Sequence, residues 1–369
     1  MEVLVRADGS SSSSEPANVP SPDIGTEQSP LLFSTTYLFE NQSLVDYDPS
    51  VELYNKLIDE LSARSSGQVY EKLLFHFPLL EGYWIEYAKS VIYSDQQKCI
   101  DILRRGLLFC HHSCHIWTEY LRLMIKLNTP TQQMGSLFKA AEKLVGWQFL
   151  SHPFWDLWIE YSVQYSQKYG LVPALPSLEP GEEVLYHILK TKTLHQFSRY
   201  YRELKLLTKL EENHLLELYI RQQTRVSKVW KYEKQLKRPF FHPKPLSQSQ
   251  KTAMVEYLDF ITPNEKQNLY ARAVEIAPYD EQLWFRYARW LIANDMDPVP
   301  VFEHAHRLLP ASLSELRMYY ALWIEYKQPA SANKVYESML HIPGISEQYT
   351  QFLEHNGLHG TSSPAQGAS

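Results

Sequence analysis

The chain repeats one arrangement of hydrophobic positions, in which an aromatic or apolar residue is followed three positions later by tyrosine. Around Trp84, the apolar residues Trp84, Tyr87, Ala88 and Val91 follow the spacing i, i+3, i+4, i+7, which places them on one face of a helix. Each pair therefore predicts a helix with one buried stripe. The pairs are Val51/Tyr54, Trp84/Tyr87, Trp117/Tyr120, Trp158/Tyr161, Phe197/Tyr200, Met254/Tyr257, Trp284/Tyr287 and Trp323/Tyr326.

A second apolar helix is expected beside each of these helices. Such segments end immediately before a proline at residues 69–77, 269–277 and 301–309, and a proline ring cannot continue a helix. Most neighbouring pairs lie about 30 to 41 residues apart, and self-similarity at this period is typical of solenoids. The pattern predicts an all-α fold, an α-α superhelix of stacked helix pairs.

The aromatic pairs have two interpretations. An exposed aromatic surface stacks the bases of single-stranded nucleic acid, whereas a buried one fills the space between stacked helices. The regular spacing of the pairs favours burial. We therefore expect the repeat core to contain Trp84, Tyr87, Trp117, Tyr120, Trp158, Tyr161, Phe197, Tyr200, Trp284, Tyr287, Trp323 and Tyr326.

The pattern divides the chain into five parts. Residues 1–30 and 357–369 are rich in Ser, Pro or Gly and lack the helical period, so we expect disordered tails. Repeats are expected over residues 31–209 and again over 251–356. Residues 210–250 break the period, and we expect there an insertion made of a basic helix and an extended, proline-rich segment that lies across the solenoid.

Positive charge is concentrated in this insertion. From Arg221 to Lys251 there are nine Lys or Arg side chains and one acid, Glu233, although the formal net charge of the chain is −6. Such a run binds RNA phosphates, binds an acidic partner segment, or is a solvated helix face. As candidate contacts to RNA or to an acidic partner we select Arg225, Lys228, Lys231, Lys234, Lys237, Arg238 and Lys244.

Composition narrows the class of protein. Three cysteines in 369 residues do not make a disulfide framework, which favours a reducing compartment. No apolar run approaches the ~18–20 residues that span a bilayer, and the N-terminus lacks a secretory pattern. Nucleotide-binding, hydrolase and metalloprotease motifs are absent from the sequence. We expect a soluble cytosolic or nuclear protein that is not an enzyme and holds no cofactor.

Residues 110–115, with the sequence CHHSCH, contain several side chains of types that bind zinc. Zinc takes four nitrogen or sulfur ligands, usually as two spaced pairs. The spacing of Cys110 and Cys114 is suitable, but no second pair follows at the expected distance. The segment lies between two predicted helices, and we interpret it as a polar turn without a metal.

The pairs resemble the half-a-TPR (HAT) repeat of RNA-processing proteins, most closely where Trp-Ile-Glu-Tyr occurs at 158–161 and 323–326. Longer strings resemble the pre-mRNA-processing factor 39 family and its paralogue, factor 42. The resemblance extends from about Tyr54 to Phe352. Its most specific strings are KRPFFHPKPL at 237–246, leading into EYLDF at 256–260, AEKLVG at 141–146, FWDLWIEY at 154–161 and LHQFSRY at 194–200.

This resemblance implies a scaffold subunit of the U1 small nuclear ribonucleoprotein (U1 snRNP). It implies a nuclear role in 5′ splice-site recognition and the commitment complex, through contacts with U1 snRNP proteins and with U1 snRNA as a further candidate partner. It also implies pairing, as a homodimer or as a heterodimer with a paralogous HAT protein, largely through C-terminal repeats. This chain ends soon after residues 348–357, which resemble the start of one more repeat, so we expect much of the family's C-terminal half to be absent.

Three alternatives stay open. The strings do not separate factor 39 from factor 42. A HAT scaffold of another RNA-processing complex, in mRNA 3′-end cleavage or ribosomal RNA processing, is disfavoured by the strings near Leu194 and Arg238. The helical-repeat α-subunit of a protein prenyltransferase is disfavoured because tyrosine, not arginine, is the partner of tryptophan in the repeated pairs.

Overall fold

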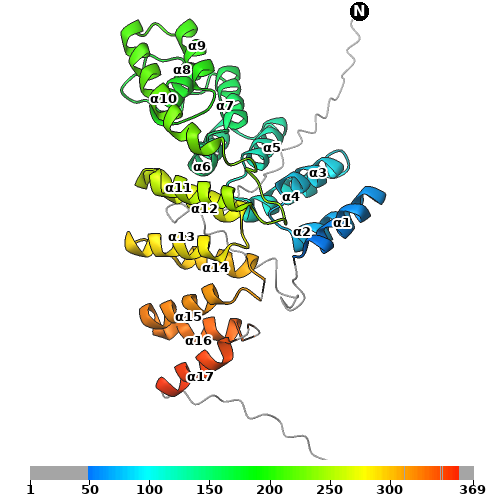
Figure 1. Cartoon of the computed structure of the whole chain (residues 1–369). Coiled ribbons are helices and arrows are strands. Elements are labelled where there is room, and N and C mark those ends of the chain that lie inside the picture. Colours follow the sequence, from blue (N-terminus) through cyan, green and yellow to red (C-terminus); the bar gives the residue numbers. More distant parts are fainter. Residues whose placement is uncertain (1–48, 311, 341, 343, 357–369) are drawn as a thin grey trace, which may run out of the picture.

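The computed structural model describes residues 49–310, 312–340, 342 and 344–356. Within these residues it contains seventeen α-helices and no strand, which confirms the predicted all-α fold (Figure 1). The expected tails, 1–30 and 357–369, lie outside the described residues.

The first ten helices are α1 (Val51–Ala63), α2 (Gly67–His76), α3 (Glu81–Val91), α4 (Gln96–Phe109), α5 (Cys114–Lys126), α6 (Thr131–Val145), α7 (His152–Gln164), α8 (Pro180–Thr191), α9 (Phe197–Leu207) and α10 (Glu212–Glu233). The others are α11 (Gln248–Phe260), α12 (Pro263–Ile276), α13 (Glu281–Ala293), α14 (Val299–Leu308), α15 (Glu315–Lys327), α16 (Pro329–Ser338) and α17 (Ile345–His355).

The helices stack as a solenoid. Neighbouring helices pack against each other, and α5 and α13 also contact the helices two places away from them. Each repeat thus buries its apolar stripe against adjacent repeats. In Figure 1 the chain rises from α1 to α9, and the long α10 leads back to a second run, α11 to α17, which descends to the bottom of the view.

A stacked pair of rings joins successive repeats. Tyr70 of α2 lies parallel to Tyr87 of α3, with ring centroids 5.1 Å apart. Such pairs contribute about 0.5–1.5 kcal/mol beyond the area that they bury. The same contact recurs at Tyr232/Tyr257, Tyr270/Tyr287 and Phe302/Tyr320, with centroids 5.3, 5.2 and 4.9 Å apart.

Local chemistry sets the ends of the helices. The side chains of Ser50, Asp95 and Ser113 each accept a hydrogen bond from the backbone N–H three residues later, at 3.2, 2.9 and 3.1 Å, and so satisfy a helix N-terminus. The helices predicted to stop at proline do so: α2, α12 and α14 end two residues before Pro78, Pro278 and Pro310. None of the described helices combines the length and the hydrophobicity that a membrane crossing requires.

Candidate functional site

Most of the predicted aromatic pairs lie in the core. Some of their tryptophan side chains also make hydrogen bonds. Trp84 Nε1 donates to the carbonyl of Pro78 at 2.8 Å, and Trp284 Nε1 donates to the carbonyl of Pro278 at 2.7 Å. Each bond ties the start of a first helix to the turn that precedes it. The buried members of the predicted set are Trp84, Tyr87, Trp117, Tyr120, Trp158, Tyr161, Phe197, Tyr200, Trp284 and Tyr287.

The prediction is wrong for Tyr326, whose side chain is 79% exposed, and Trp323 is only partly buried. The reason is a shift of register on α15. Its buried face carries Arg317 and Tyr320 at the positions that tryptophan and tyrosine occupy in other repeats. Tyr320 stacks on Phe302 of α14. Six residues further along an α-helix, Tyr326 points to a different side.

Arg317 replaces the indole in that repeat. Its guanidinium is buried and donates to the carbonyls of Pro310 and Leu313 at 2.9 and 2.7 Å, and to that of His306 at 3.0 Å. Leu309 supplies a further carbonyl acceptor. The five N–H groups of arginine suit such a cluster of acceptors. The sequence pattern has an aromatic or apolar residue at this position and therefore does not identify Arg317.

The predicted basic residues divide between α10 and the segment that follows it. Arg225, Lys228 and Lys231 lie on α10, whose last residue is Glu233. Lys228, Lys231, Lys234, Lys237 and Lys244 are exposed, while Arg225 and Arg238 are partly buried. Because α10 ends at Glu233, the cations from Lys234 onwards lie beyond the helix. Arg238 lies in the extended segment and donates to the carbonyl of Lys244 at 2.7 Å.

Glu233, the one acid in the basic run, points into the protein. Its carboxylate accepts two hydrogen bonds from Arg272 of α12, at 2.7 and 3.1 Å, and both side chains are buried. Burial alone would lower the pKa of Arg272, but the Glu233 carboxylate raises it above its ordinary value. The surface of α10 is therefore more positive than the sequence count indicates.

The proline-rich segment lies across the solenoid. Phe241 is 5% exposed and its ring meets Tyr279 edge-on, with centroids 5.7 Å apart. The next side chain, His242, meets Tyr54 of α1 at 5.1 Å. Phe240 is 50% exposed. The segment thus connects the turn after α12 with the first helix of the chain.

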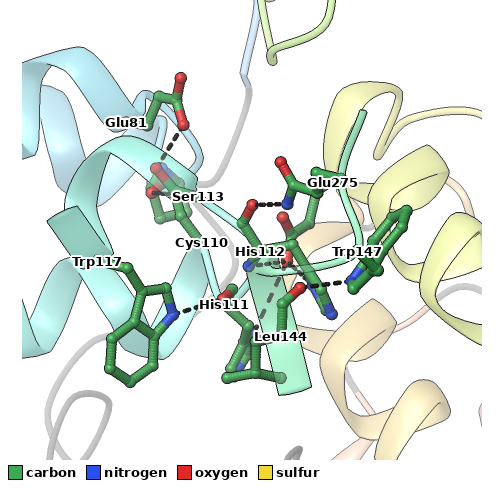
Figure 2. Close-up of polar contacts among 11 residues, drawn as sticks. Glu81, Cys110, His111, His112, Ser113, Trp117, Leu144, Trp147 and Glu275 are labelled. Carbon is green, nitrogen blue, oxygen red and sulfur yellow. Dashed lines mark hydrogen bonds and ion pairs between the residues drawn. The ribbon is translucent and has the colours of Figure 1, made fainter. Parts of the chain in front are cut away.

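A second long-range junction forms at residues 110–113, which make a buried turn (Figure 2). The His112 Nδ1 lies 2.8 Å from Glu275 Oε1 of α12, and the His112 carbonyl accepts a hydrogen bond from Gln148. On the other side, Ser113 Oγ donates to Glu81 at 2.5 Å. The turn was expected, but its burial between two distant parts of the chain was not.

Two buried thiols lie at this turn, Cys110 within it and Cys114 at the start of α5. Burial raises the pKa of Cys110 well above its usual value and that of Cys114 to about 11. The Sγ of Cys110 lies 3.5 Å from the carbonyl of Pro78. His111, in contrast, lies beside Glu275 and His304, two side chains that are distant in the sequence.

Two family models match the chain: PRP39 N-terminal HAT repeat over residues 41–205 and PRP39 C-terminal HAT repeat over residues 227–357. Together they cover most of the described residues.

Curated relatives carry related names. Pre-mRNA-processing factor 39 of Schizosaccharomyces pombe is 28% identical over 76% of this chain and 54% of the relative. The human protein of that name is 24% identical, over 77% of this chain and 51% of the relative. U1 small nuclear ribonucleoprotein component PRP42 of Saccharomyces cerevisiae is 25% identical, over 62% of this chain and 49% of the relative. The chain spans about half the length of these relatives, and on the two family matches it belongs to the PRP39 family of HAT-repeat proteins.

Proposed function

We propose that this chain is a non-catalytic scaffold of the U1 snRNP that acts in pre-mRNA splicing, at 5′ splice-site recognition and in the commitment complex. The observation that carries the proposal is the pair of PRP39 family matches, which together cover the two runs of repeats. The name of the PRP42 relative, a U1 small nuclear ribonucleoprotein component, supports the choice of the U1 snRNP as the particle. A solenoid suits this role because it presents a long surface to other macromolecules. The proposal places the protein in the nucleus.

The surface for nucleic acid is the basic surface, which we define as Arg225, Lys228, Lys231, Lys234 and Lys237. We propose that it binds phosphates of U1 snRNA, with release of counterions as the driving force. Trp230 supports this, because it lies among these cations and is 44% exposed. Aromatic rings next to cationic side chains are the usual composition of sites for single-stranded nucleic acid. An acidic protein segment is the alternative ligand.

Charge reversal tests this surface. The variant K228E/K231E/K234E changes three exposed side chains, and its matched control K126E/K139E/K143E changes the net charge equally at exposed lysines elsewhere. With a U1 snRNA stem–loop, we expect the first variant to bind at least tenfold more weakly, with a smaller dependence on salt. The control should bind like the unchanged chain. Equal binding by all three would contradict the RNA contact, and lost binding to an acidic peptide alone would favour the alternative.

Pairing with a second copy or with a paralogous HAT protein is the second part of the proposal, motivated by the family. Light scattering of the purified chain tests for a homodimer. Co-expression with the paralogue tests for a heterodimer. A monomer in both experiments would limit the scaffold to contacts with other U1 snRNP proteins.

Sedimentation tests the scaffold role as a whole. Nuclear extract containing the tagged chain is separated on a gradient, and each fraction is probed for the tag and for U1 snRNA. Co-migration that persists after mild nuclease treatment is the expected result, because protein contacts hold a scaffold. Migration with 3′-end cleavage factors or with pre-ribosomal RNA would instead favour the other RNA-processing complexes.

A further inference from the structure

Three side chains of metal-binding type converge where the two runs of repeats meet. His111 lies in the turn after α4, Glu275 on α12 and His304 on α14. One ligand atom from each lies within 4.8 Å of the other two. His111 Nδ1 is 3.9 Å from Glu275 Oε1, and the two imidazole rings have centroids 5.3 Å apart at 69°. His111 is more than 160 positions away from both Glu275 and His304 in the sequence, so only the fold brings it to them.

Both histidines are buried. Burial, together with the positive charge of Arg307, lowers the pKa of His304 to about 3. Burial and the neighbouring His304 likewise lower the pKa of His111 well below its usual value. Neutral imidazole is the form that binds a metal, because the ligating nitrogen must be free of its proton.

His304 provides an independent indication of a ligand. Its side chain is 8% exposed, and its Nε2 has no hydrogen-bond partner among the described residues. A buried polar atom without a partner costs about 1–3 kcal/mol, and unmet ring nitrogens of this kind are rare in folded proteins. A metal bound there would satisfy this atom.

The geometry points to a site for a divalent transition metal, with Zn²⁺ preferred, held by His111, Glu275 and His304. Two imidazole nitrogens and one carboxylate oxygen form a recurrent set of zinc ligands, with water in the fourth position. Ligand atoms on one tetrahedral zinc stand roughly 3.3 Å apart, given Zn–N bonds of about 2.0–2.1 Å. The side chains therefore need only a small inward movement.

The surroundings favour a transition metal over calcium or magnesium. Glu275 is next to the last residue of α12, and His111 follows the end of α4, so the negative ends of two helix dipoles face the site. Arg307 opposes any cation, and a single carboxylate is too little negative charge for a hard cation that prefers oxygen ligands. Imidazole binds zinc, nickel and copper strongly. His112 Nδ1, 2.8 Å from Glu275 Oε1, acts as a positioning residue that orients the carboxylate.

The proposed metal would have a structural role rather than a catalytic one. A metal would fasten the turn between α4 and α5 to α12 and α14, and so fix how the second run of repeats lies against the first. This inference does not depend on the proposed role in splicing, because it concerns the chain alone.

Cobalt titration of the chelator-treated, purified chain tests the site. We expect one equivalent of Co²⁺ to give the absorption of a tetrahedral complex with nitrogen and oxygen ligands, and an equivalent of Zn²⁺ to displace it. E275Q and H304N should each weaken binding at least tenfold. H115N changes a nearby exposed histidine outside the site and should bind like the unchanged chain.

The titration also has outcomes that overturn the inference. Absence of binding by the unchanged chain at micromolar Co²⁺ is one, and it needs no variant. A thiolate-to-cobalt charge-transfer band is another, because it would place the metal on Cys110 or Cys114. Equal binding by E275Q and H304N, with helix content confirmed by circular dichroism, is the third. Zn²⁺ should also raise the melting temperature of the unchanged chain and of H115N, but not that of E275Q.

Discussion

The carboxylate of Glu233 and the guanidinium of Arg272 form a two-bond ion pair, at 2.7 and 3.1 Å, that is buried between α10 and α12. It lies where the long α10 returns the chain to its second run of repeats. It also removes the only acid from the basic surface of α10. One contact therefore supports both the path of the solenoid and the charge of its exposed face.

Breaking this pair should destabilise the fold. E233Q leaves Arg272 buried without a full counter-charge, and removal of one partner of such a pair costs about 3–5 kcal/mol. The free energy of unfolding is measured by urea denaturation followed by circular dichroism. E86Q, at an exposed position, is the control and should change stability by less than about 0.5 kcal/mol. A loss below about 1 kcal/mol in E233Q would show that the pair is not essential.

The register of α15 can be tested with two identical substitutions on one helix. Y320A removes a buried ring that stacks on Phe302, and we expect it to cost about 3–5 kcal/mol. Y326A removes an exposed ring and should cost less than about 0.5 kcal/mol. Urea denaturation of both variants compares them directly. The opposite order would restore the pair Trp323/Tyr326 as the repeat core.

The proline-rich segment offers a similar test with adjacent residues. F241A should cost about 3–5 kcal/mol, because Phe241 is buried against Tyr279. F240A should leave the melting temperature nearly unchanged, since Phe240 is half-exposed. If F240A nevertheless abolishes recovery of the U1 particle in a pull-down, Phe240 contacts a partner. Equal melting temperatures for F241A and F240A would contradict docking of the segment through Phe241.

Acid should weaken the contact between α6 and α8. Burial alone would raise the pKa of Glu142, but His187 and Lys192 outweigh it and lower the pKa to about 2. The pKa in the unfolded chain is near 4.5, so this contribution is complete above pH 4.5 and is lost as the pH falls towards 2. It amounts to about 3 kcal/mol at most.

Denaturation at a series of pH values from 6 to 3 measures this loss. E142Q lacks the titrating carboxyl group, so its stability should fall less steeply with acid than that of the unchanged chain. Parallel pH profiles would show that Glu142 does not contribute through its charge.

The sequence predicted the solenoid because hydrophobic periodicity is local. The pairs at Trp84 and Trp284 identified core helices, and Pro78 and Pro278 identified the helix ends. The error at Tyr326 arose because the Trp-x-x-Tyr string of α15 lies six residues beyond the true repeat position, where arginine replaces tryptophan. A pattern of aromatic or apolar residues cannot find Arg317, which lies seven residues after Pro310, whereas Trp84 and Trp284 lie six residues after their prolines.

The long-range contacts could not be predicted. The meetings of His112 with Glu275 and of His242 with Tyr54 depend on how far each repeat rotates relative to the last, and small rotations accumulate along a solenoid. For the same reason, the CHHSCH string was interpreted as a polar turn without a metal, since the string alone lacks the side chains that lie beside His111 in the fold. The string contains His111, whereas Glu275 and His304 belong to repeats far along the chain.

The central claim is membership of the U1 particle, and the most direct test is a pull-down of the tagged chain from nuclear extract with sequencing of the bound RNA. The account predicts enrichment of U1 snRNA over the other spliceosomal RNAs, together with U1 core proteins. Enrichment of pre-ribosomal RNA or of cleavage factors, or recovery of no RNA particle at all, would contradict it.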